Sequence, residues 1–249
     1  EHEVALGGGR SHYFRLREKD DFKLDIEGLE NALTSDIDLL VICNPNNPTS
    51  SQIDRSSMRR ILDACKEKGI FVMVDETYVE FSEDTSKITS IPLTEYYNNI
   101  IILRGISAPG LRLGYAVCGN HELLKEIDSR KNPWTINSLA AIAGEIMFKD
   151  TDYINETWNL ISSERKRICG ILEKCHGLKF YKPHANFILI KILKDGITSE
   201  ELFDTAIRQG LMIRDCSTFP FLDNKYIRFC FMNPEDNDKL VKILLDKLS

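Results

Sequence analysis

The 249-residue sequence lacks the features that identify several classes of protein. Basic residues are not in excess: there are 32 lysines and arginines against 38 aspartates and glutamates, a formal net charge of −6. That balance gives no support to the binding of nucleic acid or of an anionic membrane surface. No apolar run approaches the roughly 20 residues that span a bilayer. With 43% hydrophobic and 28% charged residues, the composition is that of an ordinary globular protein.

The cysteines also lack any pairing pattern. No CxxC pair or regular spacing occurs, and the odd count argues against a disulfide framework and against a zinc or other metal site. We therefore expect reduced thiols in a cytoplasmic protein, at positions 43, 65, 118, 169, 175, 216 and 230. The sequence does not begin with methionine, and its first nine residues resemble neither a signal peptide nor a regular element. The start looks cut from something longer.

Four short apolar runs predict buried strands. They are Leu39–Cys43, Ile70–Val74, Ile100–Leu103 and Leu113–Val117. Between the first two, Asp54–Lys68 has helical periodicity, which ends at Gly69. Buried strands separated by amphipathic helices predict an α/β fold with a mostly parallel sheet that is covered on both faces.

From about Asn120 the pattern changes to helices and then to an α+β alternation. Helices are expected at His121–Arg130, Ile136–Lys149 and Tyr153–Lys174. Strands are then expected at 187–192, 211–214 and 226–231, with helices at 199–209 and 234–248. Pro234 suits a first helical turn, where a missing N–H costs nothing. We predict two domains, an α/β domain over residues 1–149 and a smaller α+β domain over residues 150–249.

The first polar motif, Asn44-Pro45-Asn46-Asn47-Pro48-Thr49, directly follows a predicted strand. Ligands of open α/β sheets bind at the C-terminal ends of the strands. The asparagines are therefore candidate binding groups, and a rigid turn built on the two prolines is the alternative.

The second motif, Val74-Asp75-Glu76-Thr77-Tyr78, also stands at the end of a predicted buried strand. A carboxylate placed there loses solvation and needs a cationic partner to stay ionised. The alternative for Asp75 is a helix N-cap, which aspartate also favours. We expect Glu76 to be solvated or structural.

The third motif runs from Ser107 to Tyr115 and reads Ser-Ala-Pro-Gly-Leu-Arg-Leu-Gly-Tyr. A serine hydroxyl and the guanidinium of Arg112, a few residues apart in a glycine-containing loop, suit a bound phosphate. A surface cation is the alternative for Arg112.

In this order and spacing, the three motifs resemble the fold-type I aminotransferases of classes I and II, which have the aspartate aminotransferase-like fold and depend on pyridoxal 5′-phosphate (PLP). The resemblance runs along the whole chain. Pro133–Ala140 and Ile213–Ser217 are similar to segments of one branch, which holds histidinol-phosphate aminotransferase and threonine-phosphate decarboxylase.

The resemblance implies a role for each matching position around the cofactor. Asn47 and Tyr78 would hydrogen-bond its phenolic oxygen. Asp75 would pair with the pyridinium nitrogen and keep the ring an electron sink. Ser107 and Arg112 would hold the phosphate.

The resemblance also implies substrate contacts. Arg228 matches the arginine that takes the substrate α-carboxylate as a bidentate pair. Arg214 and Asn137 are weaker candidates for the far end of the substrate, where this branch often binds a phosphate group. A solvated charge at a strand end is the alternative for Arg214.

The sequence departs from the family pattern around the cofactor. In the family, the serine that matches Ser107 is followed by the lysine that binds PLP, whereas here Ala108 follows. Position 50 is serine where the family usually has glycine. The family's phosphate loop and ring-stacking aromatic residue would lie before Glu1. Two interpretations remain open: the intact protein carries a segment that this sequence omits, or the lysine is deleted and PLP cannot be bound covalently.

The resemblance thus implies a PLP-dependent aminotransferase for a small amino acid, with phosphorylated amino acids among the candidates. Amino-acid and keto-acid substrates would be its partners, and a homodimer is expected because proteins of this fold usually dimerise. A threonine-phosphate decarboxylase is the alternative within the family. A non-catalytic binding protein on the same fold is the alternative if the lysine is deleted.

Overall fold

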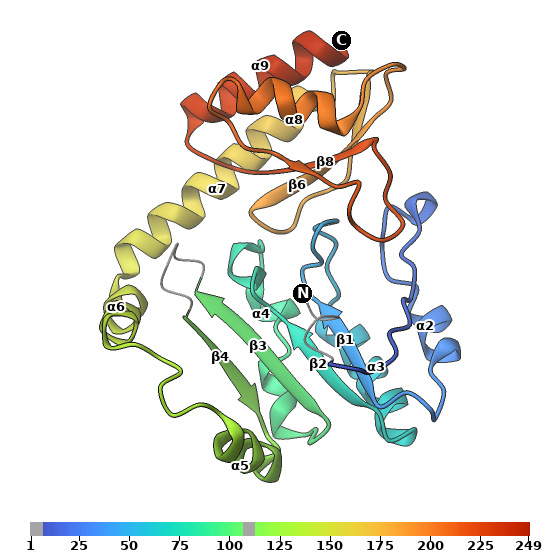
Figure 1. The fold of residues 1–249 in the computed structure, drawn as a ribbon, viewed down its shortest axis with the longest axis vertical. Helices are drawn as coiled ribbons and strands as arrows, with labels where there is room; N and C mark the ends of the chain where they lie inside the picture. Colours follow the sequence, from blue (N-terminus) through green and yellow to red (C-terminus); the bar gives the residue numbers. More distant parts are fainter. Residues whose placement is uncertain (1–6, 107–112) are drawn as a thin grey trace. The chain divides into compact units, whose positions relative to one another are not determined.

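The structure is a computed structural model that describes residues 7–106 and 113–249 (Figure 1). Its residues form two units. The first comprises Glu1–Asn44, Gln52–Val79 and Asp84–Phe148, and the second comprises Pro45–Ser51, Glu80–Glu83 and Lys149–Ser249. Two short segments from the first half of the chain therefore belong to the second unit.

The first unit is built on a mixed four-stranded sheet. Its order is β1 (Leu39–Cys43), β2 (Phe71–Asp75), β3 (Ile100–Ile106) and β4 (Leu113–Cys118). The first three strands are parallel, and β4 runs antiparallel to β3. Asp75 is opposite Cys43 on one side and Leu103 on the other, so it stands at the C-terminal end of an internal strand.

One helix, α3 (Arg55–Glu67), shows how the sequence forms the core of this unit. Asp54 caps it by accepting a hydrogen bond from the Ser57 N–H (2.8 Å), and Gly69 ends it with a φ of +74°. The apolar residues of α3 recur on one face and are fully buried, at Met58, Ile61, Leu62 and Cys65. They pack in one cluster with residues of β1, β2 and β3. Burial of this face fixes the helix on the sheet.

The other helical segments of the first unit are short or lie late in the chain. The α-helices are α2 (Ile26–Ala32), α4 (Thr85–Ile88), α5 (His121–Arg130) and α6 (Ser138–Lys149), and the 3-10 helices are η1 (Glu18–Asp20), η2 (Val79–Phe81, which continues into the second unit) and η3 (Ile91–Glu95).

The second unit is an antiparallel sheet with three helices. The sheet order is β5 (Leu178–Phe180), β6 (Phe187–Ile192), β8 (Tyr226–Cys230) and β7 (Arg214–Asp215). The helices are α7 (Thr151–Leu172), α8 (Ser199–Ile207) and α9 (Pro234–Leu248). The apolar faces of all three join those of the strands in one buried cluster.

Most predicted elements are confirmed, with bounds that often shift by one or two residues, and three of the differences have a physical reason that the structure shows. The strand predicted at Ile100–Leu103 continues to Ile106, because residues 104–106 pair with residues 113–115 of β4. The strand predicted at 211–214 is only Arg214–Asp215, although Leu211 and Ile213 are buried. Helix α6 begins at Ser138, two residues later than predicted, because Asn137 is its cap.

All seven cysteines are free thiols in the structure. Within residues 7–106 and 113–249, no helix has the length and apolar character needed to cross a membrane.

Candidate functional site

Asp75 is held in a defined orientation at the end of β2. Its backbone carbonyl accepts the Asn44 N–H (2.8 Å). One carboxylate oxygen, Oδ1, accepts both the backbone N–H of Thr77 (2.9 Å) and its hydroxyl (2.6 Å). This is a turn closed by the aspartate side chain, and the following helical turn begins only at Val79. The helix-cap alternative therefore does not describe Asp75.

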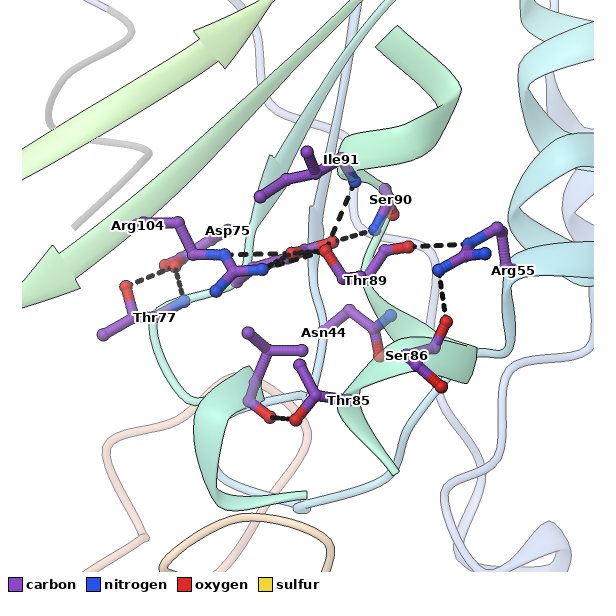
Figure 2. A network of polar contacts seen from close by, with 12 residues as sticks. Asn44, Arg55, Asp75, Thr77, Thr85, Ser86, Thr89, Ser90, Ile91 and Arg104 are labelled. Carbon is purple, nitrogen blue, oxygen red and sulfur yellow. Dashed lines mark hydrogen bonds and ion pairs between the residues drawn. The ribbon is translucent and has the colours of Figure 1, made fainter. Parts of the chain in front are cut away.

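The next residue, Glu76, is fully buried and anchors the turn. It belongs to the polar network in which Figure 2 shows Asp75, Thr77 and Arg104 close together. Its Oε2 accepts a hydrogen bond from Nε of Arg104 (3.1 Å) and forms an ion pair with Nη2 of the same residue (2.9 Å). The side chain of Arg104 is 6% exposed. The same oxygen accepts the Thr89 hydroxyl (2.9 Å), and Oε1 accepts the Ser90 N–H (2.5 Å). Glu76 is thus structural and not solvated. No local pattern around Glu76 indicates that a charge at this position is fully enclosed.

Asn44 and Tyr78 flank Asp75 in different ways. Asn44 is fully buried, and its side chain exchanges two hydrogen bonds of 2.9 Å with the backbone of Ile53. Its side chain is therefore engaged within the first unit. Tyr78 is half-buried and lies three residues after Asp75.

In the second unit, the segment Pro45–Ser51 is fixed by Ser50. Ser50 is fully buried, has a φ of +59°, and accepts the backbone N–H groups of His184 and Ala185 at its hydroxyl, each at 2.8 Å. A left-handed backbone is costly for a residue other than glycine. Here the hydroxyl provides hydrogen bonds that glycine could not.

The same segment brings Asn47 against Arg228, which is 181 residues away in sequence. Nη1 of Arg228 donates to Oδ1 of Asn47. The guanidinium carbon of Arg228 lies 4.8 Å from the ring centroid of Phe187, at cation–π distance. Nε of Arg228 is buried and has no hydrogen-bond partner among the described residues. The structure therefore brings together two residues whose predicted roles were separate, and leaves a buried donor available.

Arg214 is directly opposite Arg228 in the register of β7 and β8. Opposite residues on antiparallel strands project from the same face of the sheet. Arg214 is exposed, its Nη2 donates to the Thr218 hydroxyl (3.0 Å), and its guanidinium carbon lies 5.6 Å from the ring centroid of Phe219. Two guanidinium groups thus share one face.

The remaining predicted residues are placed differently. Asn137 belongs to the first unit, where its Oδ1 accepts the Ala140 N–H (2.8 Å) at the start of α6. Ser107 and Arg112 lie outside the described residues, as does the Ser107–Ala108 junction. The sequence contains no lysine between Gly105 and Arg112.

Cys216, two residues beyond Arg214, is unsuited to act as a thiolate nucleophile. It is fully buried, and burial raises its pKa to about 12, although the nearby Arg228 acts in the opposite direction. The protonated thiol predominates at neutral pH, and it is the weaker nucleophile.

The chain belongs to the family of class I and class II aminotransferases, whose model matches residues 2–244. The family inferred from the sequence motifs is therefore confirmed. Its fold is that of the PLP-dependent transferases, and the family's cofactor is PLP.

Two branches of the family appear among the relatives. The chain is 31% identical to the threonine-phosphate decarboxylase of Salmonella typhimurium, covering 99% of this chain and 67% of that protein. It is 33% identical to histidinol-phosphate aminotransferase 1 of Carboxydothermus hydrogenoformans, covering 94% and 64%. The crystal structure of the histidinol-phosphate aminotransferase from Clostridium acetobutylicum matches with a TM-score of 0.85 at 31% identity, covering 93% and 69%. The chain spans about two thirds of the length of these relatives.

The described residues suit PLP in their chemistry. The oriented carboxylate of Asp75 is an acceptor for a protonated ring nitrogen. Because Oδ1 of Asn47 accepts from Arg228, the amide nitrogen of Asn47 is left as the donor for an anionic oxygen. The unpaired Nε of Arg228 suits the carboxylate of a second ligand beside the cofactor, since PLP itself has no carboxylate.

Proposed function

We propose that the intact protein is a PLP-dependent aminotransferase that acts on a small amino acid, with phosphorylated amino acids among its candidate substrates. The observation that carries this proposal is Arg228. Its guanidinium is stacked on Phe187 and bonded to Asn47, while its buried Nε has no partner among the described residues. A half-buried, preoriented arginine with an unpaired Nε donor is suited to bind an α-carboxylate in bidentate fashion.

The other residues take roles consistent with this one. Bound PLP supplies an electron sink for the charge that develops when a bond to the substrate α-carbon breaks. Asp75 would accept a hydrogen bond from the N–H of the protonated ring nitrogen. The Asn47 amide and the Tyr78 hydroxyl would donate hydrogen bonds to the phenolic oxygen. Ser107 and Arg112 would hold the phosphate. By fixing the carboxylate, Arg228 would orient the α-carbon and so select the bond that breaks.

Arg214 is proposed as a contact to the far end of the substrate. It shares a face of the sheet with Arg228, and a second guanidinium there suits a phosphate group. Asn137 is a weaker candidate, because its carbonyl oxygen is engaged at the start of α6 and only its amide nitrogen is left to donate.

A threonine-phosphate decarboxylase is the second candidate. The similarity to the Salmonella enzyme favours it, and the two reactions need the same cofactor contacts. They differ in whether the α-proton or the carboxylate leaves, which depends on how Arg228 presents the substrate.

We further propose that residues 1–149 form the cofactor-binding domain and residues 150–249 the small domain of a cytoplasmic homodimer. Large apolar side chains support association of copies, because they are exposed on and before α6. On α6 and in the segment just before it, those with more than half of their surface exposed are Trp134, Ile136, Leu139, Ile142, Ile146 and Phe148.

The Ser107–Ala108 junction supports a third candidate, a binding protein on the same fold that has no lysine to bind PLP and catalyses no reaction. We favour the enzyme, in which the intact protein carries a lysine after Ser107. The binding protein has no need of all of Asn47, Asp75, Tyr78 and Arg228.

The test is a product assay on the intact gene product with PLP. Amino acids and their phosphate esters are supplied with a keto-acid acceptor, and keto-acid product and carbon dioxide are both measured. Arg228→Gln should lower kcat/KM about 100-fold, because two charge-assisted hydrogen bonds are lost. The exposed Arg208→Gln is the matched control and should be close to wild type. Carbon dioxide without keto acid selects the decarboxylase, and no product with bound PLP selects the binding protein.

A further inference from the structure

Two residues around Asp75 have no role in the function proposed above. Thr77 directs both its hydroxyl and its backbone N–H to the same carboxylate oxygen of Asp75, at 2.6 and 2.9 Å. The hydroxyl contact has the short length of a charge-assisted O–H···O⁻ hydrogen bond. Because Thr77 is only two residues from Asp75, the pair forms a closed ring that holds the plane of the carboxylate.

Gly105 gives Thr77 the room it needs. Gly105 lies inside β3, and its backbone has no positive φ that would call for glycine. A Cβ added at position 105 would lie 3.1 Å from the γ-methyl carbon of Thr77 and 3.4 Å from its hydroxyl oxygen. Glycine inside a strand is destabilising, and it commonly marks a close approach of neighbouring atoms. Here the close neighbour is Thr77.

The frame that carries Thr77 is rigid. The preceding residue, Glu76, donates its N–H to the Leu103 carbonyl (2.9 Å), and its side chain is held by Arg104. Thr77 therefore has a fixed backbone on one side and the cleared space at Gly105 on the other. Its hydroxyl has a defined target in Asp75.

We propose that Thr77 is a positioning residue that aims the Asp75 carboxylate at the ring nitrogen of PLP, and that Gly105 makes room for it. This inference rests on the role proposed for Asp75. A carboxylate that two donors hold at one oxygen is preoriented and loses little freedom when it binds the ring. Without the hydroxyl, the carboxylate rotates more freely and binds the ring nitrogen less well.

The experiment compares two probes, PLP and its carbocyclic analogue, in which C–H replaces the ring nitrogen. Their dissociation constants are measured by equilibrium titration with the chain. The change of this ratio between wild type and a variant isolates the effect on the contact between Asp75 and the ring nitrogen, because differences between the probes elsewhere on the ring are the same for both proteins. Wild type should prefer PLP.

Thr77→Val removes the hydroxyl but keeps a methyl group beside Gly105. It should lower the preference for PLP about tenfold, the scale of one hydrogen bond to a charged group, and leave the analogue's affinity unchanged. Thr77→Ser keeps the hydroxyl and should retain the preference. Thermal unfolding of each variant is the control for folding.

Gly105→Ala tests the steric part of the inference. It should lower the preference for PLP in the wild-type background, because the new methyl displaces the threonine. In the Thr77→Ser background it should have little effect, because serine has no γ-methyl group.

Three outcomes would overturn the inference. If Thr77→Val weakens both probes equally, or weakens neither, the hydroxyl does not act through the ring nitrogen. If Gly105→Ala has the same effect in both backgrounds, Gly105 is not the residue that accommodates Thr77. If wild type itself shows no preference for PLP, the role proposed for Asp75 fails, and the inference fails with it.

Discussion

Replacing Arg104 by methionine should destabilise the first unit far more than breaking an ion pair on its surface. Arg104 and Glu76 form a pair whose side chains are 6% and 0% exposed. Methionine fills much of the space of the arginine stem but leaves the Glu76 charge without its cationic partner. Removing one member of a buried pair leaves an uncompensated charge, which is costly.

The contacts that remain set the size of the effect. Glu76 would keep the Thr89 hydroxyl and the Ser90 N–H as donors, and would lose the hydrogen bond from Nε of Arg104 and the ion pair with its Nη2. Loss of one partner from a buried pair costs about 3–5 kcal/mol. Because two neutral donors remain, we expect a loss of about 3 kcal/mol in the free energy of unfolding. For a chain of this size, that corresponds to a fall of roughly 6–12 °C in Tm.

The assay is urea unfolding followed by far-ultraviolet circular dichroism. The matched control is Arg60→Met, which breaks the pair between Arg60 and Glu30, with side chains 58% and 25% exposed. That variant should be close to wild type. Adding Glu76→Gln to Arg104→Met should recover much of the loss, because no unpaired charge remains. An Arg104→Met variant no less stable than Arg60→Met would refute the reasoning.

Three further predictions concern the second unit. Ser50→Gly should lower the free energy of unfolding by about 1–3 kcal/mol, because the Ala185 N–H loses its acceptor and the His184 N–H keeps only the Ser50 carbonyl (3.2 Å). Ser50→Ala should lower it further, because alanine also strains the left-handed backbone. Equal stability of the three proteins in urea would contradict this. Hydrogen bonding from Arg167 lowers the pKa of Glu164 in the folded protein from its usual 4.5. Glu164 therefore stabilises the fold above that pH, and this stabilisation is lost as the pH falls through the lower pKa of the folded protein. Glu164→Gln should therefore reduce the fall in Tm between about pH 6 and about pH 3. Burial raises the pKa of Cys216 to about 12, so iodoacetamide at about pH 8 should label it only after unfolding, as mapped by mass spectrometry, and rapid labelling of the folded protein would count against its burial.

The elements that could be predicted were those whose local signals agree. The run Leu39–Cys43 is apolar throughout and stops at Asn44-Pro45, and the structure has that strand with the same bounds. Helix α9 begins at Pro234 and ends at Leu248, as predicted from its first proline and its periodicity. In both cases the apolar pattern and the proline next to it indicate the same boundary.

The elements whose bounds differ from the prediction are those in which some buried residues form no hydrogen bonds with a neighbouring strand. Leu211 and Ile213 are buried, but only Arg214 and Asp215 pair with β8. Apolar alternation reports which side chains face the core and says nothing of a partner strand. Short elements such as β5 (Leu178–Phe180) carry too few residues to show a period.

Around the candidate site, motifs indicated the residues that would touch a ligand, but not those that hold them. Ser50 contacts the His184–Ala185 backbone and Phe187 contacts Arg228, and both contacts join residues that are far apart in the sequence. No spacing in the sequence marks them. The Ser50 hydroxyl explains why serine is accommodated at a position with a left-handed backbone.

The most direct test of the central claim is a peptide map around Ser107. The protein expressed from the intact gene is reduced with borohydride in the presence of PLP, digested with trypsin, and searched for the peptide that begins at Gly105. We predict a lysine directly after Ser107 that carries the reduced cofactor. An unmodified peptide from Gly105 to Arg112, in which Ser107 is joined to Ala108, would contradict the proposal that this polypeptide is a PLP enzyme with a covalently bound cofactor.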